Sequence, residues 1–464
     1  MMLKSALVLF RFFIFWMIFF FLDRLIFILY FNEKTESADS FELFLTFLNG
    51  LRLDASTAIY LSAIPLLVYV VVWILRIRLP VWIPRVYVHI MITVLSFISI
   101  VNFNVYREWG GKISYRILDF LITSPKEAIA SSSSSPITSS FVIFFILIIC
   151  ALWISGKIID YELPKQRVAL WLKIPAALFF IALAGLIARG GWQLSPINQS
   201  MAYFSEKTIL NHAAINTEWN LIHDVINNKY IDDNPYQYLP AGEAKEKMAQ
   251  IYPEENGPAI NILKNQRPNV IFIILESFTG NLVESLGGEK GIAPKMEKLI
   301  SDGVFFNNVY ASGDRTDRGL VAILSGFPSQ AIRSIMKQNG KQEKLPGIGS
   351  ALGSSGYKTS FYYGGESEFF NLKSYVLSHG YTHLVDKRAF SGEDMNSKWG
   401  AYDHVVYQKF ISEMMQPQEP FFSTILTLTN HEPFELPTEP QFGNNTVEDQ
   451  FRSTAFYTDS ALYD

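Results

Sequence analysis

Asn269-Val-Ile-Phe-Ile-Ile-Leu275 is a continuous apolar run rich in β-branched residues, with Pro268 before it and Glu276 after it. Such a run is typical of a central parallel strand that is buried on both faces. Further strands and helices alternate along the rest of the C-terminal half. They are a helix from about Pro346, a strand over Thr359–Tyr363, a helix over Asp403–Met415 and a strand over Phe421–Leu428. This alternation predicts an α/β domain whose parallel sheet is flanked by helices.

The first and the last of these strands end in residues with useful chemistry. Glu276 directly follows the first strand, and Thr427-Leu-Thr-Asn-His431-Glu-Pro-Phe434 closes the last. Active sites of parallel sheets gather at the carboxyl ends of strands. Glu276 can therefore bind a divalent cation, or it can simply be an acid in the first turn of a helix. His431 can bind substrate, relay a proton or ligate a metal, and the alternative is a solvated loop histidine.

A third segment, Ala311-Ser-Gly-Asp-Arg-Thr316-Asp-Arg-Gly-Leu320, predicts an anion site. Gly313 allows a tight turn, and Thr316 lies where an apolar-periodic run begins, at or near a helix N-terminus. Free backbone N–H groups and the helix dipole favour an anion there. Arg315 and Arg318 flank the hydroxyl with guanidinium groups suited to phosphate or sulfate oxygens. Taken alone, Thr316 also fits a plain helix N-cap.

These three segments together predict one reaction centre. A threonine hydroxyl is a poor nucleophile at its free pKa, and the sequence shows no serine-hydrolase triad, so activation by a metal is the economical route. We therefore expect Glu276, Thr316 and His431 to converge on one anionic ester.

The whole chain of 464 residues is long enough for two domains, and its composition differs between the two halves. Hydrophobic residues make up 49% of it, and they are concentrated before residue 190. The net charge of −4 argues against a nucleic-acid partner. Cys150 is the single cysteine, which leaves no disulfide framework and no thiolate metal site.

The first half predicts five membrane spans, because each needs roughly 20 apolar residues. The candidates cover about 5–31, 55–75, 84–104, 137–156 and 167–188. Phe41–Leu53 is interpreted as an interfacial lead-in to the second span. Asp23 and Arg24 are expected to lie against neighbouring helices or near the interface rather than to form a functional pair.

Loop charges predict the orientation of the spans. The basic loop positions are Lys4 before the first span, Arg76, Arg78 and Arg85 between the second and third, and Lys157, Lys165 and Arg167 between the fourth and fifth. All fall on one face if the N-terminus is cytoplasmic, and five spans then place the second half outside the cell. We thus predict a membrane domain over 1–189, a connector helix and linker over 190–267 and a catalytic domain over 268–464. The amphipathic connector helix at Asn211–Ile226 is expected to pack on the catalytic domain.

Several motifs in this order resemble the lipoteichoic acid synthase-like branch of the sulfatase/alkaline phosphatase superfamily. They are the strand leading to Glu276-Ser277, Gly313-Asp-Arg-Thr316, Leu324-Ser-Gly-Phe-Pro328, Gly356-Tyr357, Thr427-Leu-Thr-Asn-His431-Glu-Pro-Phe434 and Tyr457-Thr-Asp-Ser-Ala-Leu462. The five-span anchor with an external C-terminal domain is similar too.

The resemblance implies a sulfatase/alkaline phosphatase-like fold and an enzyme on the outer face of a bacterial plasma (inner) membrane. It implies a divalent metal, usually manganese, with magnesium or zinc as alternatives. A membrane phospholipid would donate its head group to the threonine, and the group would pass to a glycan or lipid acceptor. By position, Glu276 would be a metal ligand, Thr316 the nucleophile and also a ligand, and His431 a substrate-binding residue.

The sequence departs from the family pattern at two places. The family's remaining metal ligands are an Asp-His pair beyond the last motif, so we expect a C-terminally truncated sequence with an incomplete metal site. Asp403-His404 is the only such dipeptide and lies in a helical pattern, so it is interpreted as unrelated to the metal. Phe370 and Leu372 take the places of a Trp and an Arg of glycerol-phosphate polymerases, which removes the phosphate contact that the arginine makes in that family.

The prediction is a membrane-anchored, extracytoplasmic phosphotransferase that acts through a phospho-threonine intermediate. A hydrolase is the first alternative: water would intercept the same intermediate in a phosphodiesterase, or the ester would be a sulfate. Thr316-Asp-Arg-Gly does not match the Cys/Ser-x-Pro-x-Arg context of sulfatases, which makes the sulfate ester the weakest of these readings. The other alternative is a non-catalytic protein that binds lipid or glycan. The pattern does not indicate an oligomeric state.

Overall fold

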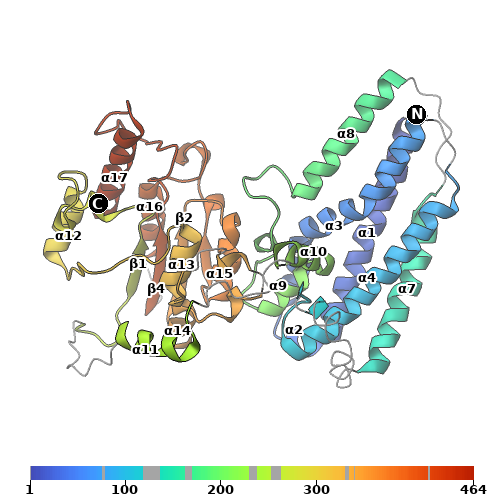
Figure 1. Ribbon diagram of the computed structural model, residues 1–464, viewed down its shortest axis with the longest axis horizontal. Coiled ribbons are helices and arrows are strands. Elements are labelled where there is room, and N and C mark those ends of the chain that lie inside the picture. Colours follow the sequence, from blue (N-terminus) through green and yellow to red (C-terminus); the bar gives the residue numbers. More distant parts are fainter. Residues whose placement is uncertain are drawn as a thin grey trace.

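The computed structural model describes residues 2–75, 79–115, 117–118, 136–161, 170–228, 238–251, 263–329, 334–338, 340–415 and 419–464. A bundle of long helices and an α/β half lie side by side, with connector helices between them (Figure 1). Arg76, Arg78, Lys165 and Arg167, on which the predicted orientation of the spans depends, lie outside the described residues, as do positions 229–237 and 252–262 of the predicted linker.

The prediction of five spans is confirmed, because five described helices are long and apolar enough to cross a membrane. They are α1 (Met2–Tyr30), α3 (Ser40–Leu75), α4 (Trp82–Trp109), α7 (Ile137–Ile158) and α8 (Leu170–Arg189), and the short helix α2 (Asn32–Thr35) follows α1. Phe41–Leu53, predicted as an interfacial lead-in, runs without a break into the second span as the first part of α3. A capping box starts the helix this early. The Glu42 N–H donates to Asp39 at 2.8 Å and the Asp39 N–H to Glu42 at 3.0 Å, which starts the helix at Ser40.

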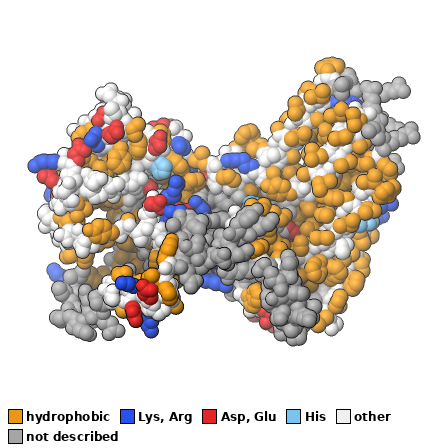
Figure 2. All heavy atoms as spheres, in the orientation of Figure 1, with side chains coloured by type: hydrophobic (Ala, Val, Ile, Leu, Met, Phe, Trp, Pro, Cys, Tyr) orange, Lys and Arg blue, Asp and Glu red, His pale blue; other side chains and the backbone are white. Residues whose placement is uncertain are grey.

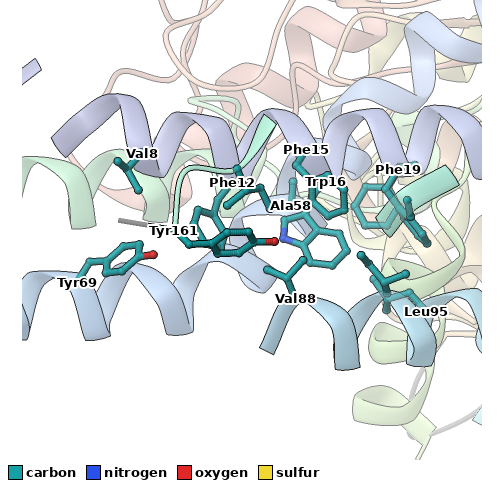
Figure 3. Packing of buried hydrophobic residues seen from close by; sticks show 14 residues of the cluster. Val8, Phe12, Phe15, Trp16, Phe19, Ala58, Tyr69, Val88, Leu95 and Tyr161 are labelled. Carbon is teal, nitrogen blue, oxygen red and sulfur yellow. The ribbon is translucent and has the colours of Figure 1, made fainter. Parts of the chain in front are cut away.

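Aromatic side chains of α1 fill the core of the bundle (Figure 3). Phe12 and Trp16 are fully buried there, against Ala58 of α3 and Val88 of α4. The rings of Phe12 and Tyr69 meet edge to face, with centroids 5.8 Å apart, which is a preferred aromatic geometry. Hydrophobic side chains also cover the outer surface of this half, as a membrane-spanning bundle requires (Figure 2).

A buried ion pair joins the first two spans. Arg24 of α1 donates to Asp54 of α3 through both terminal nitrogens, at 2.7 and 2.8 Å, and both side chains are almost fully buried. The prediction that Arg24 lies against a neighbouring helix is confirmed, with Asp54 rather than the adjacent Asp23 as its partner. Asn216 adds a hydrogen bond to Asp54 at 3.0 Å.

We expect Asp54→Ala to lower the free energy of unfolding of the bundle by about 3–5 kcal/mol, because it leaves the Arg24 charge buried without its carboxylate. Thermal unfolding of the purified protein in detergent, followed by helix content, measures this. Asp160→Ala is the matched control, since it removes the partner of Arg11 in an exposed pair at 3.6 Å and should cost at most about 1 kcal/mol. Equal losses in the two variants would contradict the prediction.

The C-terminal half contains a four-stranded parallel sheet in the order β1-β4-β2-β3, which confirms the predicted α/β class. The strands are β1 (Val270–Ile274), β2 (Lys358–Tyr363), β3 (His383–Val385) and β4 (Phe421–Leu426). The sequence did not indicate β3, because three residues are too few to show a strand period. β4 lies between β1 and β2, so the carboxyl ends of these three strands meet at one edge.

Helices cover both faces of the sheet. They are α13 (Thr316–Ser325), α14 (Ile348–Ser354), α15 (Leu372–Ser378), α16 (Asp403–Glu413) and α17 (Val447–Tyr463). The helix α12 (Pro294–Asp302) contacts α17, where Asp459 accepts from its first N–H groups. Leu320 of α13 and Val376 of α15 share a core cluster with Phe422 of β4, and on the other face Val406 of α16 packs with Ile425. Alternate residues of one strand therefore serve two cores.

The connector helices are α9 (Thr208–Ala214), α10 (Thr217–Asn228) and α11 (Ala241–Ile251). Trp219 of α10 shares a core cluster with Leu53 of α3, and Leu221 shares one with Ile113 beyond the end of α4. The prediction that Asn211–Ile226 packs on the catalytic domain is therefore wrong for its apolar face. That face finds its partners on the membrane helices instead.

Candidate active site

Two of the predicted site residues are in direct contact. Glu276 lies just beyond the end of β1, and Thr316 is the first residue of α13. The Thr316 hydroxyl donates to the Glu276 carboxylate and lies 3.0 Å from each carboxylate oxygen. The Glu276 N–H in turn donates to the Thr427 hydroxyl, at 2.7 Å, beyond the end of β4. The ends of two adjacent parallel strands thus position the pair.

The start of α13 explains why the Thr316 side chain is free to reach Glu276. Arg315 is the N-cap residue, with extended backbone angles and no side-chain capping bond. Thr316 is therefore not the N-cap that its sequence context also allowed. A Cβ at Gly313 would lie 2.6 Å from the backbone nitrogen of Gly319, so only glycine allows the preceding loop to pack this closely against the first turn.

The backbone after β1 is strained where it leaves the site. Ser277 has a φ of 54°, a left-handed conformation that is uncommon outside glycine. Its carbonyl accepts from the side chain of Asn430 at 3.1 Å, and Asn430 accepts from the Thr454 hydroxyl at 2.6 Å. Such strain persists only when surrounding contacts hold it, and it gathers at functional sites. Here the contacts tie Glu276 to the loop that carries His431.

His431 lies beyond β4, next to Trp399. The two rings have centroids 4.4 Å apart, and the Trp399 Nε1–H donates to the Glu432 carbonyl at 2.6 Å. Burial raises the pKa of Glu276, whereas the hydrogen bond from Thr316 and the charge of His431 oppose that rise. Sequence reasoning missed Trp399, which packs against the His431 ring.

The two arginines differ in their surroundings. Arg315 is exposed, whereas Arg318 donates to Asp314 at 2.7 Å. Sequence reasoning also missed a third cation near this helix turn, since Lys337 pairs with the buried Asp317 at 2.6 Å. The only local signal was the acidic residue between the arginines, and Lys337 comes from a distant segment. Three cations thus lie near the start of α13, and two of them are paired with Asp314 and Asp317.

Asp403 and His404 both bond within the fold. Asp403 is buried and accepts from the N–H groups of Leu428 and Thr429 at 2.7 and 3.1 Å and from the Thr458 hydroxyl at 2.9 Å. His404 pairs with the Tyr457 hydroxyl. The partners of this dipeptide thus come from the segment just beyond β4 and from α17.

The residues of the site provide part of what a divalent cation needs. Within the residues that the structure describes, no group of three or more His, Cys, Asp or Glu side chains could hold a metal ion. The Glu276 carboxylate and the Thr316 hydroxyl are oxygen donors of the kind that hard divalent ions prefer. Two such donors fit one side of a metal site and do not complete it, because these ions take four to six or more ligands.

Phe370 and Leu372, at the positions of the family's Trp and Arg, have different surroundings. Leu372 is fully buried in the core of the sheet, so it contributes packing rather than a contact to phosphate. Phe370 and Asn371 have φ values of 43° and 68°, and the Phe369 ring lies 5.6 Å from that of Trp399. An aromatic surface therefore continues from His431 through Trp399 to this segment.

Comparison with known proteins gives the protein family that the C-terminal half matches. Residues 268–463 match the family model described as Sulfatase. This part of the chain is therefore a sulfatase domain.

The particular relatives are lipoteichoic acid synthases, to which the chain is homologous. Lipoteichoic acid synthase 1 of Bacillus subtilis (strain 168) is 29% identical over 210 residues, which are 42% of this chain and 32% of that protein. Lipoteichoic acid synthase of Staphylococcus aureus (strain USA300) is 25% identical over 347 residues, 70% of this chain and 50% of that protein. The chain thus spans about a third to a half of the length of these relatives.

Among solved structures, a protein in the alkaline phosphatase superfamily from Vibrio parahaemolyticus is similar, with 30% identity and a TM-score of 0.41. The match covers 43% of this chain and 50% of that one.

Proposed function

We propose that this chain acts as a membrane-anchored, extracytoplasmic phosphotransferase that moves a phospholipid head group, phosphoglycerol or similar, to a glycan or lipid acceptor. One observation carries the proposal: the Thr316 hydroxyl, at the start of a helix, donates to both oxygens of Glu276 at the end of β1. Homology to lipoteichoic acid synthases supports it. The predicted cytoplasmic N-terminus and the five spans support an external position for the sulfatase domain.

The reaction proceeds in two displacements at phosphorus. The Thr316 oxygen bonds to the phosphorus of the donor, and the hydroxyl proton passes to the carboxylate that it already faces. The bond from phosphorus to the diacylglycerol oxygen breaks, and that oxygen takes a proton from solvent and departs as diacylglycerol. The N–H groups of the first turn of α13, with Arg315 and Arg318, hold the phosphoryl oxygens. His431 binds the head group beside Trp399. An acceptor hydroxyl then displaces the threonine oxygen and restores Thr316.

Glu276 and Thr316 would be two of the ligands of a divalent cation, for which manganese is the proposed ion. Such an ion lowers the pKa of a bound hydroxyl and neutralises phosphate charge.

A labelled donor tests the proposal. The purified protein is placed in vesicles that contain phospholipid labelled in the head-group phosphate, together with a glycolipid acceptor. We expect mass spectrometry to find the head-group phosphate on the peptide that contains Thr316, and the label to reach the acceptor. Label that passes only to water would instead identify a hydrolase. Absence of both the modified threonine and label release would overturn catalysis at this site.

Glu276→Gln is expected to slow formation of the phospho-threonine by about a hundredfold or more, because the neutral amide neither takes the hydroxyl proton nor binds a cation as a carboxylate does. The rate of label transfer to the Thr316 peptide measures this. Glu297→Gln is the matched control. Glu297 lies on the exposed helix α12, and its carboxylate also accepts a hydrogen bond from a hydroxyl, that of Ser285. A normal rate in Glu276→Gln would show that this carboxylate has no part in the chemistry.

A further inference from the structure

The sulfatase domain meets the connector through several polar contacts and one apolar contact, made by Leu377 of α15. The Leu194 N–H donates to Glu366 at 3.2 Å and the Asn198 side chain to the Glu368 carbonyl at 2.8 Å. The hydroxyls of Ser200 and Ser374 lie 3.0 Å apart, and both serines are fully buried. Polar contacts of this kind, unlike a large apolar interface, permit two domains to separate and rejoin.

One charged contact stands at the centre of this junction. The Nε2 atom of His212, in α9, lies 2.9 Å from a carboxylate oxygen of Glu343. The Nδ1 atom of the same ring lies 3.0 Å from the hydroxyl of Tyr106 in α4. Tyr203 of the connector donates its hydroxyl to the same carboxylate. Glu343 belongs to a short 3-10 helix of the sulfatase domain, Gln342–Lys344. A spanning helix, the connector and the sulfatase domain are thus linked side chain to side chain.

The Glu343 carboxylate is held in its charged form. Burial raises the pKa of Glu343, but the charge of His212 and the hydrogen bonds from His212 and Tyr203 outweigh burial and hold the pKa below its ordinary value. His212 is 5% exposed. A buried carboxylate paired with a histidine is a strong contact while it is made and a costly one to break by removing one partner.

The connector side of this contact is fixed to the membrane half. Arg24 donates to the carbonyls of Ala213 and Ala214 at 2.9 and 3.2 Å, and Lys112 donates to the carbonyls of His212 and Ile215 at 2.9 and 2.6 Å. Four successive carbonyls at the end of α9 are therefore capped by cations of the bundle. Because α9 is held in this way, separation would occur on the other side, between His212 and Glu343.

Space for solvent lies next to the pair. A cavity of about 250 Å³ is lined by His212 and Glu343 together with polar residues of both halves, among them Gln199, Asn220 and Lys344. A polar cavity of this size holds several waters. Water can therefore solvate both side chains as soon as they part, which lowers the cost of opening.

We propose that His212 and Glu343 form a releasable lock between the membrane half and the sulfatase domain. With the lock closed, the sulfatase domain is held against α9 and η2 (Gln199–Met201), as in Figure 1. With the lock open, the buried serine pair between the halves separates, and the domain is tethered only by its chain connection. Its use in catalysis rests on the proposed function, whereas the lock itself does not.

Accessibility of Ser374 tests the lock without any assay of activity. Cys150, the single cysteine, is replaced by serine, and Ser374→Cys places a thiol in the junction. The rate of maleimide labelling is measured on the full chain in vesicles. We expect Glu343→Gln and His212→Gln each to raise this rate at least about tenfold, because losing one partner of a buried charged pair costs more than a factor of ten in an equilibrium. The double variant should label at most about twofold faster than either single variant, since all three variants remove the same contact.

The chain offers two matched controls. Glu413 accepts from His383 at 3.1 Å and from Tyr362 at 2.8 Å, as Glu343 accepts from a histidine and a tyrosine, but all three lie within the sulfatase domain. Glu413→Gln should leave labelling of Ser374→Cys unchanged. Ser423→Cys, whose site is fully buried in the sheet, should stay unlabelled in every lock variant.

A disulfide gives a second measurement. In the Cys150→Ser background, Ser200→Cys with Ser374→Cys should cross-link readily while the lock is closed and several-fold more slowly with Glu343→Gln. The lock is overturned if labelling and cross-linking of the Glu343→Gln variant match the parent. It is equally overturned if Ser423→Cys labels as fast as Ser374→Cys, because the variant then unfolds the domain rather than opening the junction.

Discussion

Thr316→Ala is expected to reduce head-group transfer by about ten-thousandfold or more, because no other hydroxyl takes its place on the phosphorus and the residual rate comes from binding alone. Thr316 contacts both oxygens of Glu276, and the preceding loop packs closely against the first turn of α13 at Gly313. Release of labelled head group from vesicles containing the purified protein measures the loss.

Thr316→Ser separates the role of the hydroxyl from that of the fold. Serine retains the oxygen and loses only a methyl group, so we expect transfer within about a hundredfold of the parent, far above that of Thr316→Ala. Both variants should unfold at nearly the parent temperature, since Thr316 is only partly buried. Transfer by Thr316→Ala at the parent rate would end the proposal that this hydroxyl attacks phosphorus.

Asp403→Ala is expected to destabilise the sulfatase domain by about 3–5 kcal/mol. The variant leaves two backbone N–H groups beyond β4 and the Thr458 hydroxyl without their acceptor in a buried place, and each such loss costs about 1–3 kcal/mol. Equilibrium unfolding of the purified protein in denaturant, read from aromatic fluorescence, measures the change. Because Asp403 supports the loop that leads to His431, transfer should fall together with stability.

Asp403→Asn and Asp394→Ala bracket this result. The amide oxygen of Asn can still accept from the backbone, and burial already raises the pKa of Asp403, so the neutral replacement should cost at most about 1–2 kcal/mol. Asp394 accepts a hydrogen bond from Ser391 on the exposed surface at 2.7 Å, and its alanine variant should change stability by less than about 0.5 kcal/mol. A loss in Asp403→Ala as small as that in Asp394→Ala would show that the buried bonds are not needed.

Much of the fold followed from local patterns. The five spans were visible as long apolar runs, and β1, β2 and β4 as short ones, because burial in a membrane or in a parallel sheet demands apolar residues over a fixed length. The start of α3 was missed, although Asp39 and Glu42 form a recognisable capping pair. β3 was missed because its three residues show no period.

Only part of the candidate site could be predicted from the sequence. Glu276, Thr316 and His431 stood out as polar residues at the ends of apolar runs, and the structure puts the first two in contact. Trp399 and Lys337 carried no such signal, because each is an ordinary residue until the fold brings it to the site. The assigned roles of the three predicted residues stay predictions.

The amino-acid sequence by itself determined the five spans and the strands β1, β2 and β4, since those depend on periodicity and on neighbours a few residues away. Only the tertiary structure decided that Arg24 bonds to Asp54, that the connector packs on the membrane helices, and that His212 meets Glu343 across 131 positions of chain. Pairings over such distances are set by how the elements are connected and packed, and no local pattern records them.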